Sequence, residues 1–213
     1  MSILNEIDSS VQQGRAKKVK ELVEQALAEG VSAKDILEKG LIAGMSVIGE
    51  KFKVNEVFVP EVLIAARAMN AGIGLLKPYL ADGSVQAKGK AVIGTVKGDL
   101  HDIGKNLVKL MLEGKGLEVV DLGVDVDAET FVQAAINNQA DIICLSALLT
   151  TTMNEMKNVI AEAERKGIRD KVKIMIGGAP ITQAFCDTIG ADCYTADAAS
   201  AADAALNFCA KQA

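Results

Sequence analysis

The sequence predicts an α + α/β chain, in which an N-terminal four-helix bundle precedes a doubly wound, five-stranded parallel sheet. Three observations favour this fold class. Apolar residues recur at helical spacing before residue 85, β-branched runs alternate with amphipathic stretches after residue 90, and the segment between them is polar and contains glycine. We therefore expect two domains, a helical bundle at 1–85 and an α/β domain at 90–213, joined by a linker at 81–90.

The first part contains four helical stretches. A short helix is expected from Ile3 to Gln12, and a second places its apolar residues on one face between Val19 and Leu27. Ser32, with Asp35 three positions on, resembles a capping pair that starts the third helix. Pro60 suits the first turn of a fourth, because proline lacks the amide proton that a first turn leaves unpaired. Four such helices are typical of a bundle.

Five short apolar runs follow, at residues 91–96, 117–122, 141–146, 172–177 and, more weakly, 191–195. Helical stretches begin after them, near Gly104, Ala128, Thr152, Thr182 and Ala198. Strands that alternate with helices and are apolar on both faces indicate a parallel sheet covered on both sides, of flavodoxin type. In the strand order 2-1-3-4-5 a ligand would bind over the carboxyl ends of strands 1, 3 and 4.

The composition argues against several classes of protein. A net charge of −5, 3% aromatic residues and no block of Lys and Arg do not favour a nucleic-acid surface. No apolar run reaches the roughly 20 residues of a membrane span, and the first residues do not resemble a secretion signal, so we expect a cytoplasmic protein without a membrane partner. The four cysteines form no C-x-x-C pair and are expected to be small buried apolar residues.

The single histidine, His101, lies in "KGDLHDIG" at the end of the first strand, and "SALLTTT" and "GGAPI" follow the third and fourth. This loop fits neither a phosphate-binding P-loop nor a dinucleotide fingerprint. A phosphorylated receiver domain would need an aspartate at the end of the third strand, where this chain has Ser146. Ser146 as a catalytic nucleophile stays open but weak, because no nucleophile elbow surrounds it.

One imidazole cannot build a zinc site, which takes three or four side chains. It can be the single protein ligand of a metal whose other positions a macrocycle fills. Asp99 would then accept the proton of the other ring nitrogen and orient the ring.

Three separated motifs carry a family resemblance. They are D-x-H-x-x-G at Asp99, His101 and Gly104, S-x-L at Ser146 and Leu148, and G-G at Gly177 and Gly178. Together they resemble the signature of the cobalamin-binding domains of cobalamin-dependent methionine synthase. The stretch "GMSVIGEKF…VFVPEVLIAARAM" is similar to the helical cap that precedes this domain in corrinoid methyltransferases. The resemblance covers nearly the whole chain.

The resemblance implies a base-off cobalamin whose cobalt takes His101 as its lower ligand. It also implies a relay from His101 through Asp99 to the hydroxyl of Thr152, where the family has serine. Uptake of a proton by the Asp99–His101 pair would help to stabilise the reduced cobalt when the imidazole leaves. The residues expected at the lower face and along the nucleotide tail are Gly98, Asp99, Leu100, His101, Asp102, Gly104, Ser146, Leu148, Thr150, Thr152, Gly177, Gly178 and Ala198.

The cap is expected to cover the upper face of the corrin ring. By resemblance Phe52 and Val59 touch that face, and Glu38 and Val62 fall on further matched cap positions. Val59 is smaller than the leucine often found at its position in the family. From periodicity alone, all four residues would be ordinary bundle residues.

The resemblance further implies a corrinoid methyl carrier that catalyses little alone. A substrate-specific methyltransferase would load the cobalt, a second would unload it to an acceptor such as a tetrahydrofolate or a thiol, and an ATP-dependent reductive activator would rescue oxidised cobalt. The alternative is a cobalamin-dependent sensor or regulator, although the bundle lacks a basic recognition helix. A small subunit of an adenosylcobalamin mutase conflicts with the helical cap. The sequence does not name the methyl donor.

Overall fold

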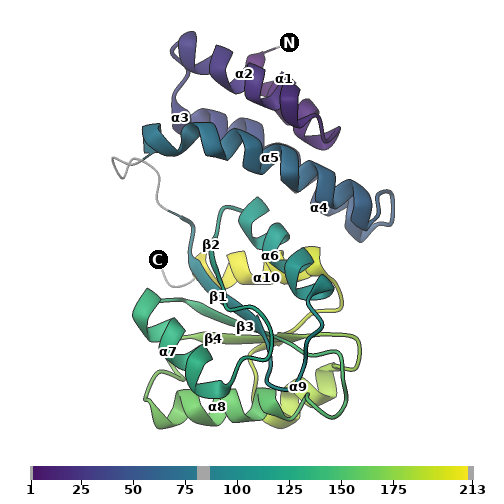
Figure 1. Cartoon of the computed structure of the whole chain (residues 1–213), viewed down its shortest axis with the longest axis vertical. Coiled ribbons are helices and arrows are strands. Elements are labelled where there is room, and N and C mark those ends of the chain that lie inside the picture. The colour runs from purple at the N-terminus through teal and green to yellow at the C-terminus, as the bar shows by residue number, and fades with distance from the viewer. Residues whose placement is uncertain (1, 81–86, 211–213) are drawn as a thin grey trace. The chain divides into compact units, whose positions relative to one another are not determined.

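The computed structural model describes residues 2–80 and 87–210 and divides the chain into two compact units. The first contains the N-terminal helices, and the second, which starts at Lys88, contains the sheet (Figure 1). The expected linker at 81–90 falls mainly on residues outside the described ranges, so the boundary at residue 85 stays a prediction.

The helical unit consists of four successive helical rods. They are α1 (Ile3–Gln12), α2 (Ala16–Ala28), a continuous rod of α3 (Ala33–Asp35), η1 (Ile36–Ile42) and α4 (Ala43–Lys53), and α5 (Val59–Leu80). The hydroxyl oxygen of Ser32 accepts a hydrogen bond from the Asp35 amide at 3.1 Å, which confirms the predicted cap. Pro60 is the second residue of α5, as expected. The π-helical segment η1 was not predicted, because seven residues are too few to reveal a change of period within a helix.

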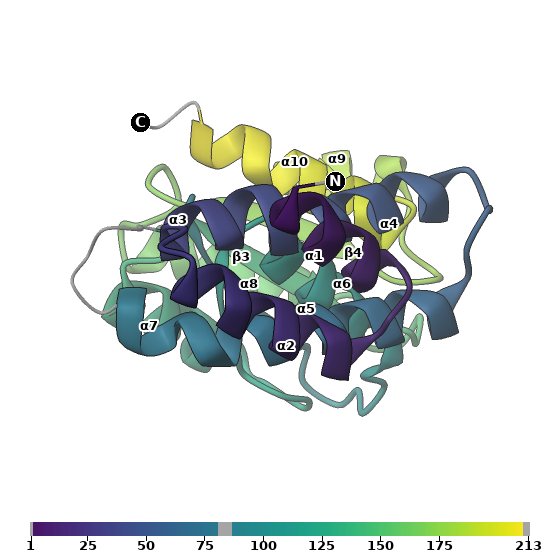
Figure 2. The ribbon, with the colours of Figure 1, turned by 90° about the horizontal axis from the view of Figure 1, so that it is seen from above.

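The core of this unit lies between α1, α2, α5 and the third rod, whose helices are shown from above in Figure 2. Apolar side chains from all four rods are fully buried there, among them Ile7, Val19, Leu41 and Met69. Glycines allow the close approach of α1, because a Cβ on Gly44 would lie 2.7 Å from the Asp8 carbonyl oxygen. Close packing and burial of apolar side chains therefore stabilise the bundle.

Helix α5 bears on the expectation that no segment is long and apolar enough to span a membrane. Its 22 residues are apolar enough, by length and composition alone, to cross a membrane. It nevertheless carries Glu61, Arg67 and Lys77, and it buries a row of residues from Val62 to Leu76 against the other helices of the bundle. A core helix of this kind passes the same test, so α5 is no more than weak evidence for a membrane span.

The α/β unit contains a five-stranded, wholly parallel sheet in the order β2-β1-β3-β4-β5, as predicted. The strands are β1 (Lys90–Thr95), β2 (Glu118–Asp121), β3 (Ile142–Ser146), β4 (Lys173–Gly177) and β5 (Cys193–Tyr194). The last, weakest run forms a strand of two residues. This order reverses direction between β1 and β3, which is where ligands bind in folds of this class.

Helices cover both faces of the sheet. They are α6 (Ile103–Gly114), α7 (Ala128–Asn138), α8 (Glu155–Arg165), α9 (Gln183–Ile189) and α10 (Ala198–Ala210). Figure 1 shows α7, α8 and α9 on one face and α6 and α10 on the other. One hydrophobic core, which includes Phe131, Ile143 and Val159, lies between the sheet and α7, α8 and α9.

One predicted helix start is wrong in a way that matters for the site. The helix expected near Thr152 begins at Glu155, and turns occupy the residues before it. The Thr152 amide bonds to the Leu149 carbonyl oxygen at 3.1 Å, and the side-chain hydroxyl approaches the same oxygen at 3.0 Å. These turns keep Thr152 beside the end of β3 rather than carrying it away along a helix axis.

Candidate functional site

The strand register brings the three predicted loops to one edge of the sheet. Thr95 of β1 pairs with Ser146 of β3, and Ser146 pairs with Gly177 of β4, so the carboxyl ends of these strands form one row. The segments that follow, 96–102, 147–154 and 178–182, therefore leave the sheet side by side. This row is the switch point of the strand order.

A buried carboxylate stands at the centre of this row. Asp99 is fully buried, and its Oδ1 lies 2.8 Å from Nδ1 of His101 and accepts the His101 amide at 3.1 Å. Its Oδ2 accepts the amides of Leu148 at 2.8 Å and Leu149 at 3.2 Å, and lies 2.9 Å from the Thr152 hydroxyl. Asp99 thus joins the loop after β1 to the loop after β3.

No cation neutralises this carboxylate in the hydrogen bonds of the site. Burial opposes the charged form of Asp99 and by itself raises the pKa of its carboxyl. The amide of Leu148, the side chain and amide of His101 and the hydroxyl of Thr152 outweigh burial and hold the pKa well below its usual range. Asp99 therefore stays ionised near neutral pH and acts only as an acceptor.

The ionised carboxylate fixes the proton of the imidazole. An acceptor 2.8 Å from Nδ1 requires the proton to lie on Nδ1, which leaves the lone pair of the neutral ring on Nε2. The His101 side chain is 52% exposed, whereas that of Asp99 is 0% exposed. The site therefore presents the lone pair of Nε2 on a half-exposed ring, and the hydrogen bond to Asp99 fixes the orientation of that ring.

The hydroxyl of Thr152 has two acceptors within reach but only one proton. They are Oδ2 of Asp99 at 2.9 Å and the Leu149 carbonyl oxygen at 3.0 Å. The charged oxygen is the stronger acceptor, so the proton points to Asp99. The added methyl of threonine faces Gly98, where a Cβ would lie 3.4 Å from Thr152 Cγ2.

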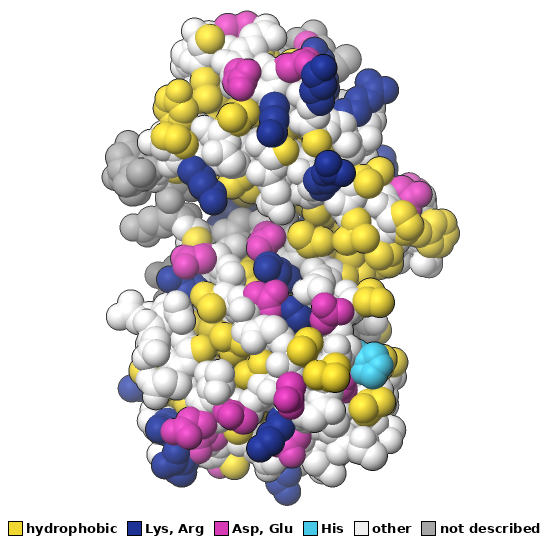
Figure 3. Space-filling model, viewed as in Figure 1, with side chains coloured by type: hydrophobic (Ala, Val, Ile, Leu, Met, Phe, Trp, Pro, Cys, Tyr) yellow, Lys and Arg dark blue, Asp and Glu magenta, His cyan; other side chains and the backbone are white. Residues whose placement is uncertain are grey.

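Apolar side chains surround this polar centre. On the His101 loop and at the start of α6, Leu100 is 71% and Ile103 79% exposed, and on the loop after β3 Leu148 is 43% and Leu149 40% exposed. Figure 3 shows the histidine in cyan beside yellow apolar side chains on the surface of this unit. A contiguous group of exposed apolar side chains is typical of a binding surface.

This donor set suits a metal held by a flat organic ring better than a bare ion. Within residues 2–80 and 87–210, no group of three or more His, Cys, Asp or Glu side chains could hold a metal. One oriented imidazole nitrogen with apolar neighbours instead matches a macrocycle that supplies the remaining ligands and rests its face on apolar side chains. The residues present therefore fit a cobalt corrinoid.

The two glycines at the end of β4, Gly177 in the strand and Gly178 after it, differ in their surroundings. A Cβ on Gly177 would meet no atom within 4 Å, so this position opens onto free space. Gly178 has φ +134°, and a Cβ there would overlap the carbonyl oxygen of Ala147. Gly178 is thus required by the fold, whereas Gly177 leaves a gap beside the sheet.

The remaining predicted residues vary in accessibility. Asp102 and Thr150 on the loops and Gly104 in the first turn of α6 are exposed, and Ser146 at the end of β3 is half-buried. The carboxylate of Asp102 accepts a hydrogen bond from the side-chain amide of Asn106 at 3.0 Å, so it lies on the α6 side of its loop. Ala198 is buried at the start of α10.

In the helical unit, Glu38, Phe52 and Val59 are half-buried. Val62 is fully buried. The contacts expected for all four cap residues stay predictions.

Two contributors were missed. The hydroxyl of Thr95, fully buried, donates to the His101 carbonyl oxygen at 2.8 Å and ties the loop to the end of β1. Thr95 could have been found from the sequence, because it is a polar residue at the end of an apolar strand. The Leu149 amide binds Asp99 through its backbone, and backbone groups leave no mark in a sequence.

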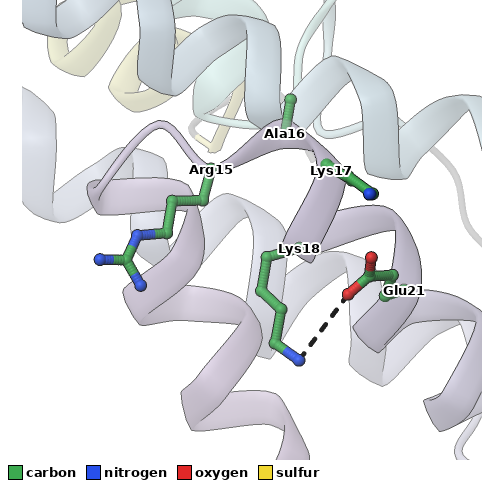
Figure 4. Close-up of a pocket in the computed structure, with 5 residues that line it drawn as sticks. All are labelled: Arg15, Ala16, Lys17, Lys18 and Glu21. Carbon is green, nitrogen blue, oxygen red and sulfur yellow. Dashed lines mark ion pairs between the residues drawn. The ribbon is translucent and has the colours of Figure 1, made fainter.

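A surface hollow lies elsewhere, at the start of α2. It is lined by Arg15, Ala16, Lys17, Lys18 and Glu21 (Figure 4). Its one drawn ion pair joins Lys18 to Glu21 at 3.9 Å, and both side chains are about half exposed, so the pair stabilises little. The hollow contains no group related to the chemistry of His101.

The fold and the site define a cobalamin-binding protein. Residues 89–206 match the family model described as "B12 binding domain", and residues 3–77 match a second model with the same description. The chain belongs to the family of corrinoid proteins of methyltransferase systems, and its cofactor is a cobalamin or related cobalt corrinoid.

Relatives of known name span nearly the same length. The chain is 45% identical over 199 residues to dimethylamine corrinoid protein 3 of Methanosarcina acetivorans, which covers 93% of each chain. It is 44% identical over 192 residues to the trimethylamine corrinoid protein of Methanosarcina barkeri, with 88% of each covered. A corrinoid protein of Desulfitobacterium hafniense is 40% identical over 214 residues, with 99% of each covered.

Solved structures agree. The chain resembles a chain of the methanol:cobalamin methyltransferase complex of Methanosarcina barkeri with a TM-score of 0.89 and 32% identity, over 98% of this chain and 80% of that one. A cobalamin-binding protein of Desulfitobacterium hafniense matches with a TM-score of 0.79 and 29% identity, over 96% and 98%. The predicted α + α/β fold class is therefore confirmed.

Proposed function

We propose that this protein carries a methyl group on a corrinoid held by His101, between methyltransferases that are separate chains. The observation that carries the proposal is the half-exposed imidazole whose Nδ1 lies 2.8 Å from a fully buried carboxylate. When bound, the corrinoid supplies a cobalt ion that accepts and releases a methyl group.

The residues beneath the cofactor have separate tasks. His101 offers Nε2 as the lower ligand, and Asp99 keeps the proton on Nδ1 and increases the donor strength of the ring. Thr152 and the two leucine amides hold Asp99 in place as an anion. Because its contacts stabilise Asp99 as the anion, the carboxylate remains the acceptor for the Nδ1 proton.

The flanking residues would accommodate the rest of the cofactor. The exposed side chains of Leu100, Ile103 and Leu148 offer apolar contact to the lower face. The space beside Gly177 would take the displaced nucleotide tail, with Ser146, Thr150 and Gly178 along it. Glu38, Phe52, Val59 and Val62 of the cap would lie toward the upper face, and Ala198 near the tail.

Partner chains would supply the catalysis. Relatives are named for dimethylamine and trimethylamine, so methylamine methyltransferases are the first donor-side partners to test. An acceptor methyltransferase and an ATP-dependent reductive activator complete the proposed system, in the cytoplasm. The sensor alternative is not favoured, because the named relatives are corrinoid proteins of methyltransferase systems.

The ligand proposal is tested by reconstitution with hydroxocobalamin. His101 is the only histidine, so growth on ¹⁵N-labelled histidine labels one side chain. After one-electron reduction, we expect the electron paramagnetic resonance spectrum to show coupling of cobalt to a single labelled nitrogen. His101→Ala should bind corrinoid more weakly, with a water-ligated visible spectrum and no such coupling. Wild-type protein without nitrogen coupling would refute the proposal.

The carrier proposal has its own assay. Holo-protein with reduced cobalt is mixed with a methylamine methyltransferase and labelled donor, and the label on the corrinoid is measured before and after addition of an acceptor methyltransferase. We expect loading and unloading to require both partners. Loading by this chain alone, or no loading with any methyltransferase of the methylamine, methanol or methoxyarene classes, would contradict it.

A further inference from the structure

Asp125 lies in the loop between β2 and α7, and its backbone conformation is unusual. Its φ is +56°, in the left-handed region that residues other than glycine rarely adopt. Within residues 2–80 and 87–210, only Asn55 and Gln139 share this feature among non-glycine residues, and Gln139 caps a helix end. Asp125 caps no helix, so its conformation needs another explanation.

The contacts of Asp125 supply it. Its Oδ1 accepts the Gly98 amide at 2.7 Å, and its own amide donates to the Asp99 carbonyl oxygen at 3.0 Å. Asp125 therefore binds the segment at both ends, through the amide of Gly98 and the carbonyl oxygen of Asp99. Gly98 itself has φ +80°, so the segment is sharply turned at this point.

The loop that carries Asp125 is anchored to the sheet. The amide of Val126 donates to the Thr95 carbonyl oxygen at 3.0 Å, and the Thr95 amide donates to Gly123 at 3.0 Å. An isolated bridge pairs Val96 with Val126. Asp125 thus transmits the rigid geometry of the sheet edge to the segment that contains Asp99.

We infer that Asp125 is a positioning residue for the cobalt ligand. It holds the backbone of Gly98 and Asp99 so that the Asp99 carboxylate meets Nδ1 of His101 at 2.8 Å. The inference rests on the proposed function, in which His101 binds cobalt. It adds a support from the β2–α7 loop, which none of the three sequence motifs includes.

The test uses substitutions that separate the carboxylate from the backbone strain. Asp125→Gly removes the acceptor, yet glycine adopts positive φ freely, so any effect reports the lost side chain. Asp125→Asn keeps an acceptor oxygen and a residue tolerated in the left-handed region. Asp127→Gly is the matched control, because Asp127 lies two residues on, carries the same charge and caps α7 by accepting the Thr130 amide at 2.8 Å.

Two readouts are used. Nitrogen NMR of the protein without corrinoid reports the tautomer of the single imidazole, and the visible spectrum of the hydroxocobalamin form reports imidazole against water on cobalt. We expect Asp125→Gly to mix the tautomers and to raise the ratio of water-ligated to imidazole-ligated cofactor about tenfold, the lower range for losing a contact that orients a ligand. Asp125→Asn and Asp127→Gly should resemble wild type in both.

The outcomes distinguish the inference from the proposal beneath it. Asp125→Gly with wild-type tautomer and spectrum, or Asp127→Gly with equal changes, would overturn the role of Asp125. Absence of imidazole on cobalt in wild type would overturn the ligand proposal, while the NMR comparison would still decide whether Asp125 orients His101. If Asp125→Gly does not fold, hydrogen exchange of wild type decides instead, because a Gly98 amide exchanging as fast as an unstructured one excludes the bond to Asp125.

Discussion

The two ends of the parallel sheet each hold a well-bonded aspartate, but the two are satisfied differently. At the amino end Asp192 accepts the Ile174 amide at 2.8 Å and pairs with Lys173 at 3.0 Å and Arg169 at 2.8 Å. At the carboxyl end the hydrogen bonds to Asp99 come from amides, a hydroxyl and an imidazole. Two cations compensate the negative charge of Asp192, whereas the negative charge of Asp99 acts on the imidazole of His101.

The comparison shows how one kind of residue serves stability at one edge and a ligand at the other. Asp192 keeps 15% of its side chain exposed and its partners are structural. Asp99 is fully buried, and one of its partners reaches the surface with a free lone pair. A buried carboxylate with neutral donors and one exposed imidazole is therefore the signal that separates a site from a structural ion pair.

Removing each carboxylate is the strongest way to break this comparison. Asp99→Ala leaves several donors without an acceptor, so we expect the free energy of unfolding to fall by about 3–5 kcal/mol, because each unsatisfied buried donor costs about 1–3 kcal/mol. Corrinoid affinity should fall about 10–100-fold. Urea unfolding and titration with hydroxocobalamin measure the two effects.

Asp192→Ala is the matched control at the other end. It should cost about 1–3 kcal/mol of stability, because its partners keep some access to water. The cobalt spectrum should not change. An altered spectrum in Asp192→Ala, or an unaltered one in Asp99→Ala, would remove the functional distinction between the two ends.

The pH dependence of stability sharpens the same point. The pKa of Asp99 is depressed in the folded state, and an unfolded aspartate titrates near 3.9, so its contribution is fully present above about pH 5 and lost as the pH falls below that value. In thermal melts from pH 7 to pH 3, Asp99→Asn should remove part of the acid destabilisation.

Asp35 provides the control for the pH experiment. The side-chain hydrogen bond from Lys39, followed by that from Ser32, lowers the pKa of this exposed carboxyl. Water and salt screen such a pair, so Asp35→Asn should leave the acid profile close to wild type, most clearly at high salt. If both variants reduce the loss of stability at low pH equally, burial of Asp99 is not the cause of that loss.

The two glycines at the end of β4 test fold and binding separately. Gly178→Ala would place a Cβ against the Ala147 carbonyl oxygen at an unfavourable φ, and should destabilise the protein by at least about 2 kcal/mol. Gly177→Ala meets no atom within 4 Å, so stability should change by less than about 1 kcal/mol while corrinoid binding weakens. Equal corrinoid affinity in Gly177→Ala and wild type would exclude this gap as the tail site.

Much of the α/β unit could be predicted, for a physical reason. The alternation of apolar strands with helices is local in sequence, so the parallel sheet was accessible. The strand order followed from the fold class, and the contact of Asp99 with Thr152 was implied by the family resemblance. The amides of Leu148 and Leu149 and the carboxylate of Asp125 were not, because those contacts exist only once distant loops are folded together.

The helical unit was predictable as a fold but not as a site. Its apolar period correctly indicated four helical rods, yet the same period puts a core residue and a ligand contact on one helix face. Val62 illustrates this, since it falls on a matched cap position and is fully buried, which a core residue would also be. The π-helical turns of η1, which include Glu38, also shift the phase of that helix without a sequence signal.

Thr152 offers the smallest and finest test of the Asp99 end. Thr152→Val keeps the shape but removes the hydroxyl, so Asp99 loses one of several donors and stability should fall by about 1–2 kcal/mol. Thr152→Ser keeps the donor and removes only the methyl that faces Gly98, so the change should be below about 1 kcal/mol. Urea unfolding of the protein without corrinoid measures both.

The cobalt spectrum of these two variants then separates charge support from packing. If the hydroxyl serves by holding Asp99 as an anion, Thr152→Val should shift the balance from imidazole-ligated toward water-ligated cofactor, and Thr152→Ser should not. If the methyl instead serves by pressing Gly98 into its turn, the order of the two variants reverses. The second result would mean that Thr152 supports Asp99 through the backbone of the loop and not through the carboxylate. Asp125 binds the same part of the backbone.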